Sequence, residues 1–177
     1  GFCAPDVKAL ISLFADHLID NEMRTERYGD GDLKPRVRHG EIQPHELHRL
    51  RELMQQALDD ETLFKEWFGT MISEAKHDLD VSPMEPDYSA EEVADLLTQG
   101  EPAIKVPGLR SVWFSGESRS CYIDGEAWTL PSEDAAAISL LCDKDIITQA
   151  DMVELADQAG FLQLLTRLIN RGYWFFG

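Results

Sequence analysis

Two prolines within four residues, Pro83 and Pro86, divide the chain into halves with different sequence patterns. Proline removes a backbone donor and fixes φ, so segment 81–87 suits neither a helix interior nor a central strand. Before it, apolar residues recur at helical spacing, and after it short β-rich runs alternate with glycine-containing turns. The sequence therefore predicts a linker here, with one domain over residues 1–82 and another over residues 83–177.

Three helices are predicted in the first half, over about residues 6–23, 44–58 and 62–79. Asp6 can cap the first helix, Pro44 suits the first position of the second, and the acidic run 59–61 favours the N-terminal end of the third. The glycine-containing loop 26–42 is expected to be mobile or bound by a partner. The second helix is expected to bury one side, formed by Leu47, Leu50, Met54 and Leu58.

The apolar arc of the first helix is the widest of the three. It covers about 240° of the helix circumference, against about 140° for the second helix and about 180° for the third. A helix this apolar needs cover on two sides, and a second copy of the chain supplies the second side most simply. In an intact longer protein, another domain could cover that side instead. The sequence therefore predicts a homodimer. Its expected interface consists of Val7, Leu10, Ile11, Phe14 and Leu18.

The second half predicts a small antiparallel sheet among short helices. Ser89 and Glu92 form a capping box that opens a helix ending near residue 98. Asp124-Gly125, between two alternating runs, is a strong hairpin signal. Strands are expected at 103–106, 110–114, 120–123 and 126–130, helices at 132–141, 148–157 and 161–170, and a buried strand at 173–176 after Gly172. The fold class is thus α+β, mostly helical, with a winged-helix-like second domain.

The net charge of the chain indicates which classes of partner it can bind. It has 16 Lys and Arg against 33 Asp and Glu, a net charge of −17, which repels phosphate backbones and anionic membranes and favours basic partners. Residues 83–177 alone have 6 basic and 16 acidic residues, so DNA binding is not expected. No apolar run reaches the roughly 18 residues of a membrane span. The three cysteines form no CxxC pair, as expected of reduced thiols in a cytoplasmic protein.

No catalytic, cofactor-binding or metal-binding residue is predicted. His45 and His48 share a helix face, with Glu41 or Glu52 near, but their spacing is not that of the His-Glu-x-x-His zinc motif. Solvated helix residues explain this pair better than a metal site does. Neither a phosphate-binding loop nor a Gly-x-Ser-x-Gly nucleophile motif occurs.

Four stretches, in order over nearly the whole chain, are similar to one family: residues 1–5 (GFCAP), 46–54 (ELHRLRELM), 64–80 (FKEWFGTMISEAKHDLD) and 170–176 (NRGYWFF). They resemble the C-terminal part of the bacterial ribosomal-protein arginine hydroxylases, which are iron(II)- and 2-oxoglutarate-dependent oxygenases. This family implies a cupin, or JmjC-like, barrel, a helical dimerisation domain and a winged-helix-like domain. Residues 1–5 would then be the tail of the last barrel strand. The chain has no His-x-Asp, so no residue of the family's metal site is carried over.

The resemblance implies that the chain is the non-catalytic dimerisation and substrate-docking portion of such an oxygenase. The parent protein would use Fe(II) and 2-oxoglutarate to hydroxylate an arginine of a basic large-subunit ribosomal protein in the cytoplasm. Two alternatives remain: a stand-alone acidic winged-helix adaptor and a transcription regulator. Coding sequence upstream for His-x-Asp and a later His would exclude the adaptor, whereas a basic face would favour the regulator.

Overall fold

The computed structural model of the chain describes residues 5–20, 38, 40–75, 79 and 81–177. The chain divides into two compact units, residues 1–67 and 68–177. Helix α3 (Glu61–Ser73) begins in the first unit and ends in the second. The domain boundary placed between residues 82 and 83 stays a prediction. The proposed barrel-strand tail, apart from Pro5, and most of loop 26–42 lie outside the described residues.

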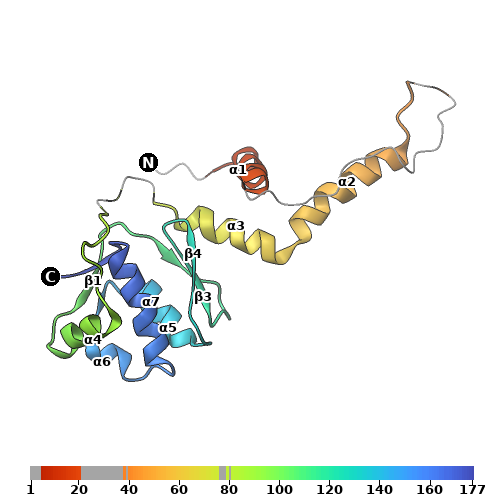
Figure 1. The fold of residues 1–177 in the computed structure, drawn as a ribbon. Helices are drawn as coiled ribbons and strands as arrows, with labels where there is room; N and C mark the ends of the chain where they lie inside the picture. The colour runs from red at the N-terminus through yellow and green to blue at the C-terminus, as the bar shows by residue number, and fades with distance from the viewer. Residues whose placement is uncertain (1–4, 21–37, 39, 76–78, 80) are drawn as a thin grey trace. The chain divides into compact units, whose positions relative to one another are not determined.

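The first unit contains α1 (Val7–Asp20), α2 (Pro44–Asp59) and the first part of α3 (Figure 1). As predicted, Asp6 caps α1, because its Oδ1 accepts a 2.9 Å hydrogen bond from the Ala9 N–H. The two helices α1 and α3 meet through aromatic rings. The ring centroid of Phe14 lies 5.8 Å from that of Phe64 and 5.1 Å from that of Trp67, both in edge-on geometries. This cluster forms the small apolar centre of the unit.

The expected burial of the apolar side of α2 is wrong for the single chain. Leu47, Met54 and Leu58 are 55%, 63% and 51% exposed. The spacing of these residues did predict the helix itself, since hydrophobic periodicity sets which side is apolar. Periodicity does not say what covers that side, and nothing in the described part of the chain does.

Helix α3 ends at Ser73 rather than near residue 79 as predicted. Its C-terminal residues are held by the turn between two strands instead. The Ser73 hydroxyl accepts a 3.0 Å hydrogen bond from the Gly125 N–H, and the Asp124 carboxylate accepts one of 3.2 Å from the Ala75 N–H. The Ala75 N–H thus donates to Asp124 instead of to the Met71 carbonyl oxygen, as it would in a longer helix.

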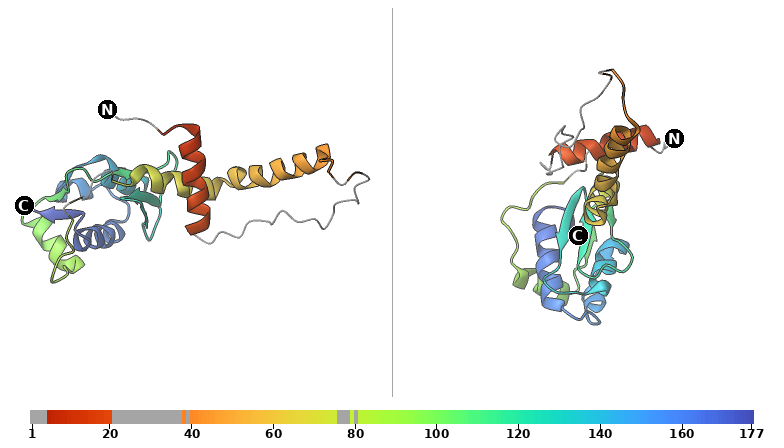
Figure 2. Two further views of the ribbon diagram at one scale, coloured as in Figure 1. Left: turned by 90° about the horizontal axis from the view of Figure 1, so that it is seen from above. Right: turned by 90° about the vertical axis from the view of Figure 1, so that its right-hand side faces the viewer.

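The described part of the second unit holds four further helices and two three-stranded antiparallel sheets. The helices are α4 (Ala90–Thr98), α5 (Ala135–Asp143), α6 (Gln149–Met152) and α7 (Gln158–Asn170). The strands are β1 (Ala103–Lys105), β2 (Ser111–Val112), β3 (Ser120–Ile123), β4 (Glu126–Thr129), β5 (Ile146–Ile147) and β6 (Trp174–Phe176). One sheet has the order β5-β1-β6 and the other β2-β3-β4. Helices α4 and α7 lie side by side, as both views of Figure 2 show.

The hairpin predicted at Asp124-Gly125 is confirmed. Both turn residues have positive φ, 50° and 77°, which a two-residue turn matched to the strand twist requires. The turn fixes the register of β3 against β4, so Ile123 faces Glu126 and Cys121 faces Trp128. Helix α6, by contrast, is shorter than the predicted 148–157, because the chain turns after Met152 to reach α7.

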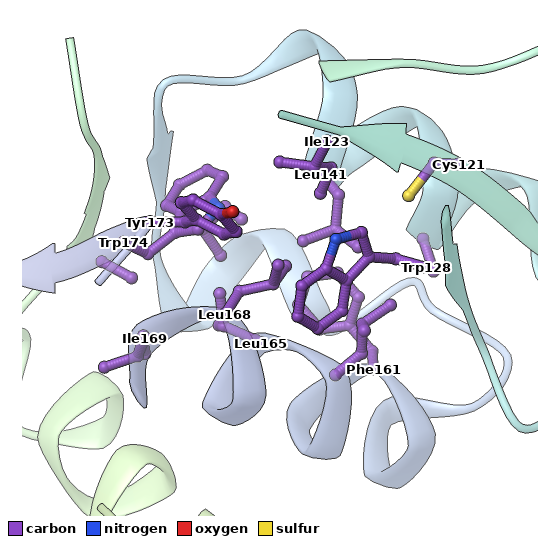
Figure 3. Packing of buried hydrophobic residues seen from close by; sticks show 14 of the residues in the cluster. Cys121, Ile123, Trp128, Leu141, Phe161, Leu165, Leu168, Ile169, Tyr173 and Trp174 are labelled. Carbon is purple, nitrogen blue, oxygen red and sulfur yellow. The ribbon is translucent and has the colours of Figure 1, made fainter. Parts of the chain in front are cut away.

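The core of the second unit forms around α7 (Figure 3). Phe161, Leu165, Leu168 and Ile169 are fully buried on this helix, and Figure 3 shows Trp128 reaching over it from β4. The predicted burial of the C-terminal aromatic run is confirmed for Tyr173 and Trp174, which are 4% and 0% exposed, but is wrong for Phe175, which is 37% exposed because successive side chains of β6 alternate between faces. The unit therefore has a continuous apolar core of its own.

The segment predicted as a linker lies against α7 and is called here the strap, residues 81–88. The Met84 N–H donates a 3.0 Å hydrogen bond to the Asn170 carbonyl oxygen. The Asn170 side chain donates to the Tyr88 carbonyl oxygen and accepts from the Tyr88 N–H, both at 2.9 Å. Two prolines thus prevent regular structure, as expected, yet the segment is ordered by its contacts with one helix.

Candidate functional site

The described residues contain no group of three or more His, Cys, Asp or Glu side chains placed to hold a metal ion. His48 Nε2 lies 3.2 Å from Glu52 Oε1 on α2, and both side chains are more than half exposed. This pair is a surface contact along one helix. No helix of the described part is long and apolar enough to cross a membrane.

The five residues predicted for the dimer interface differ widely in exposure. Val7 and Ile11 are 70% and 60% exposed on α1, whereas Leu10 and Leu18 are half-buried. Phe14 is buried within the chain, against the rings of Phe64 and Trp67. The interface stays a prediction, and the exposed pair is the part of it that a partner could reach.

If α7 were the recognition helix of a DNA-binding winged-helix domain, its side chains would have to be accessible, but few of them are. Most of its side chains are buried in the core of the second unit. The exposed positions within it are Gln158, Ala159, Gln163 and Arg167. A DNA reader needs several polar and basic side chains on one free helix face. Since α7 offers a single cation, it is a core helix of the unit.

The basic side chains of residues 83–177, all of which are described, are mostly held by other groups of the chain. Arg110 and Arg119 donate to the carbonyl oxygens of Glu74 and Leu130. Lys144 pairs with Asp151, and Arg171 pairs with Glu126. Lys105 is buried, and Arg167 lies over the Trp128 ring. Few cations are left for phosphate contacts.

We expect the chain not to bind duplex DNA usefully, because non-specific affinity depends on the number of phosphates neutralised. A fluorescence-anisotropy titration of the whole chain with a labelled duplex at low salt is the measurement. Sub-micromolar binding that weakens steeply with added salt would contradict this and favour the transcription regulator.

Lys105 is a buried cation that sequence reasoning missed. Its Nζ donates a 3.0 Å hydrogen bond to the Cys142 carbonyl oxygen at the end of α5 and lies 5.2 Å from the centre of the Trp174 ring. Burial lowers the pKa of Lys105, while the Asp145 carboxylate, 4.0 Å away, raises it and offsets part of that effect. The alternation of side chains between the two faces of β1 could have predicted this burial, since Lys105 shares a sheet face with buried Ala103.

The lowered pKa of Lys105 predicts how stability changes with pH. At pH below the folded-state pKa the buried ammonium opposes folding, and this cost disappears as pH rises toward the ordinary value of 10.5. The free energy of unfolding should therefore rise with pH relative to that of a Lys105→Met variant, by about 1.4 kcal/mol for each unit of pKa depression. Urea unfolding of both proteins between neutral and alkaline pH measures this difference. If the difference in free energy of unfolding between the two proteins does not change with pH, burial of the Lys105 ammonium costs no free energy.

Comparison with known proteins places these features in a family. Residues 52–175 match the family model described as ROXA-like winged helix. The chain is 35% identical over 176 residues to the ribosomal protein uL16 3-hydroxylase of Escherichia coli (strain K12), covering 99% of this chain and 46% of that protein. The chain thus spans about half the length of this relative.

Solved structures agree with the sequence match. The crystal structure of the Escherichia coli ribosomal oxygenase YcfD superposes with a TM-score of 0.87 at 35% identity, over 100% of this chain and 48% of that one. The structure of YcfD in complex with cobalt and 2-oxoglutarate gives a TM-score of 0.84 at 36% identity, over 99% and 47% of the two chains. The family inferred from the four sequence stretches is confirmed, as is the winged-helix-like second half. The chain belongs to the ROXA-like winged helix family and is homologous to the C-terminal part of a ribosomal oxygenase.

Proposed function

We propose that the chain is the non-catalytic dimerisation and substrate-docking portion of an oxygenase that hydroxylates an arginine of a large-subunit ribosomal protein. The observation that carries this is the extent of the match, which covers nearly all of this chain but only 46% of a ribosomal protein hydroxylase. The remaining length of the parent would contain the reaction centre. The net charge of −17 suits a basic ribosomal protein as the docking partner.

The described residues do not fit an iron(II) site of the parent. Such a site needs two histidines and a carboxylate that converge with open positions, and no described cluster of this kind exists. Iron and 2-oxoglutarate would therefore be held by the part of the parent outside this chain. When bound, they would supply the oxidation, while residues of this chain position the subunits and the substrate.

The proposed catalytic role of the parent can be tested by comparing two proteins. The chain extended by the segment that precedes it in its gene should convert 2-oxoglutarate to succinate when given the large-subunit ribosomal protein, and mass spectrometry should show one added oxygen on an arginine. The chain alone should give no turnover above a buffer blank. A longer protein without turnover, or a preceding segment without His-x-Asp, would contradict the proposal and favour the adaptor.

The dimerisation part of the proposal rests on apolar surface in the first unit. Val7 and Ile11 on α1 are well exposed, and α2 exposes Leu47, Met54 and Leu58 at helical spacing. Exposed apolar rows of this kind are characteristic of protein–protein interfaces. A second copy of the chain would cover them, with Phe14 supporting α1 from inside the unit.

We expect Ile11→Arg to convert a dimer into a folded monomer. Ile11 is 60% exposed, so an arginine is tolerated in the single chain but would place an unpaired charge in the interface. Light scattering gives the mass, and circular dichroism checks the helices. Val153→Arg is the matched control, because Val153 is equally apolar and 66% exposed but lies in the second unit.

Two outcomes of this experiment would change the assignment. A dimeric Ile11→Arg variant would move the interface to the exposed row of α2, where Met54→Arg is the next test. An unfolded variant would show that Ile11 belongs to the core of the unit.

A further inference from the structure

The edge of β4 is open in the second unit. The two-residue turn makes Ile123 and Glu126 a hydrogen-bonded pair, and bonded pairs then alternate along the ladder. The 2.8 Å bond from the Leu130 N–H to the Arg119 carbonyl oxygen continues this alternation. The backbone N–H and C=O groups of Ala127 and Thr129 therefore point away from β3. Both residues are exposed, and no hydrogen bond among residues 81–177 uses these groups.

Native proteins usually protect such an edge with Lys, Pro, a bulge or a covering segment. The sequence of β4 is Glu-Ala-Trp-Thr, in which the one charged residue, Glu126, stands at the start of the strand, and Ala127 and Thr129 carry no charge. A hollow of about 430 Å³ adjoins the strand instead. It lies between β4, the C-terminal turn of α7 and the strap.

Arg167 gives this hollow its chemistry. Its guanidinium carbon lies 5.1 Å from the centre of the Trp128 ring, and Trp128 itself is 7% exposed, so the ring forms a rigid support beneath the cation. Every other basic side chain of residues 83–177 has a carboxylate or carbonyl partner. Arg167 has neither. Two carboxylates also line the hollow: Glu126, which pairs at 2.8 Å with Arg171, and Asp87, which is exposed on the strap.

We propose that the open edge of β4 and this hollow, together called the β4 groove (Ala127, Trp128, Thr129 and Arg167), bind an extended peptide segment of another protein that carries an Asp or Glu side chain. The peptide would add as a further strand, with main-chain hydrogen bonds to Ala127 and Thr129. Its carboxylate would pair with Arg167, and a planar guanidinium suits bidentate pairing of this kind. Because the chain as a whole is acidic, a single carboxylate among neutral residues suits the groove better than an acidic run.

This proposal does not depend on the oxygenase assignment. The two can fail separately, because peptide binding at the β4 groove needs neither a second copy nor a reaction centre.

The test is a selection of short random peptides displayed on phage against the whole chain, followed by fluorescence anisotropy of the enriched peptides. We expect sequences with one Asp or Glu among β-branched residues. Arg167→Gln should weaken their binding about tenfold or more, and Arg167→Glu should shift the selection toward Lys or Arg peptides. Lys144→Gln is the matched control, since it removes the same charge from an exposed side chain that does not line the groove.

Ala127→Pro tests the strand addition itself. Its N–H faces away from β3, so proline removes a donor from the edge without removing a ladder bond, and circular dichroism should be unchanged. Peptide binding should fall about tenfold or more. Selection without acidic preference, or unchanged binding by both Ala127→Pro and Arg167→Gln, would overturn the proposal. So would an RNA oligonucleotide that binds through Arg167 while no peptide does.

Discussion

Gly172→Ala is expected to lower the free energy of unfolding by about 2–5 kcal/mol, because two separate costs add. Gly172 has a φ of 88° and ends α7, with the Tyr173 N–H donating to the Leu168 carbonyl oxygen at 2.9 Å. A non-glycine residue is strained in this conformation. A Cβ there would also meet the backbone of the strap, where the Ser82 carbonyl carbon would be 2.9 Å away.

Gly116→Ala separates the two costs. Gly116 has a similar φ of 86° but open space around the position of a Cβ. Its substitution should cost about 1–2 kcal/mol, the conformational part alone. Urea unfolding of the two variants measures the difference. Equal losses would show that the strap moves aside freely and is not part of the packed unit.

Asp134→Ala is expected to destabilise the second unit by about 2–4 kcal/mol, because one buried carboxylate serves two segments. Asp134 Oδ1 accepts from the Ala137 N–H at 3.1 Å and so caps α5. Its Oδ2 accepts from the N–H groups of Ala156 and Asp157, at 2.9 and 3.3 Å, where the chain enters α7. Alanine would leave all three donors without this acceptor in a site that is 7% exposed.

Ser89→Ala is the matched control for Asp134→Ala. Ser89 caps α4 from an exposed position, where water can replace the lost acceptor, so the expected cost is about 1 kcal/mol. Thermal unfolding of both variants gives the comparison. A loss for Asp134→Ala no larger than that for Ser89→Ala would mean that the link from α5 to α7 adds nothing beyond a cap.

Local signals predicted much of the second half of the chain. The Asp-Gly turn and the capping box at Ser89 depend on hydrogen bonds within a few residues. The local sequence therefore specifies them independently of the tertiary structure. The burial predicted for the C-terminal aromatic run holds for Tyr173 and Trp174 but not for Phe175, which is 37% exposed. The proposed interface residues on α1 were chosen by periodicity, and the structure separates buried Phe14 from exposed Ile11.

The early end of α3 and the packing of the strap depend on distant contacts. Helix α3 stops at Ser73 because a turn about fifty residues away in sequence provides its partners. The strap is ordered because Asn170 reproduces backbone hydrogen bonds for Tyr88. Neither contact can be inferred from the sequence pattern of the segment that it orders.

The sequence by itself determined the helical first half, the hairpin, the mixed second half and the acidic charge, since each is a property of neighbouring residues or of composition. Only the tertiary structure decided which apolar sides are covered and which cations are free. Within the described part of the chain, the apolar row of α2 stays exposed and Arg167 has no carboxylate partner, because burial and pairing depend on what folding brings near each side chain.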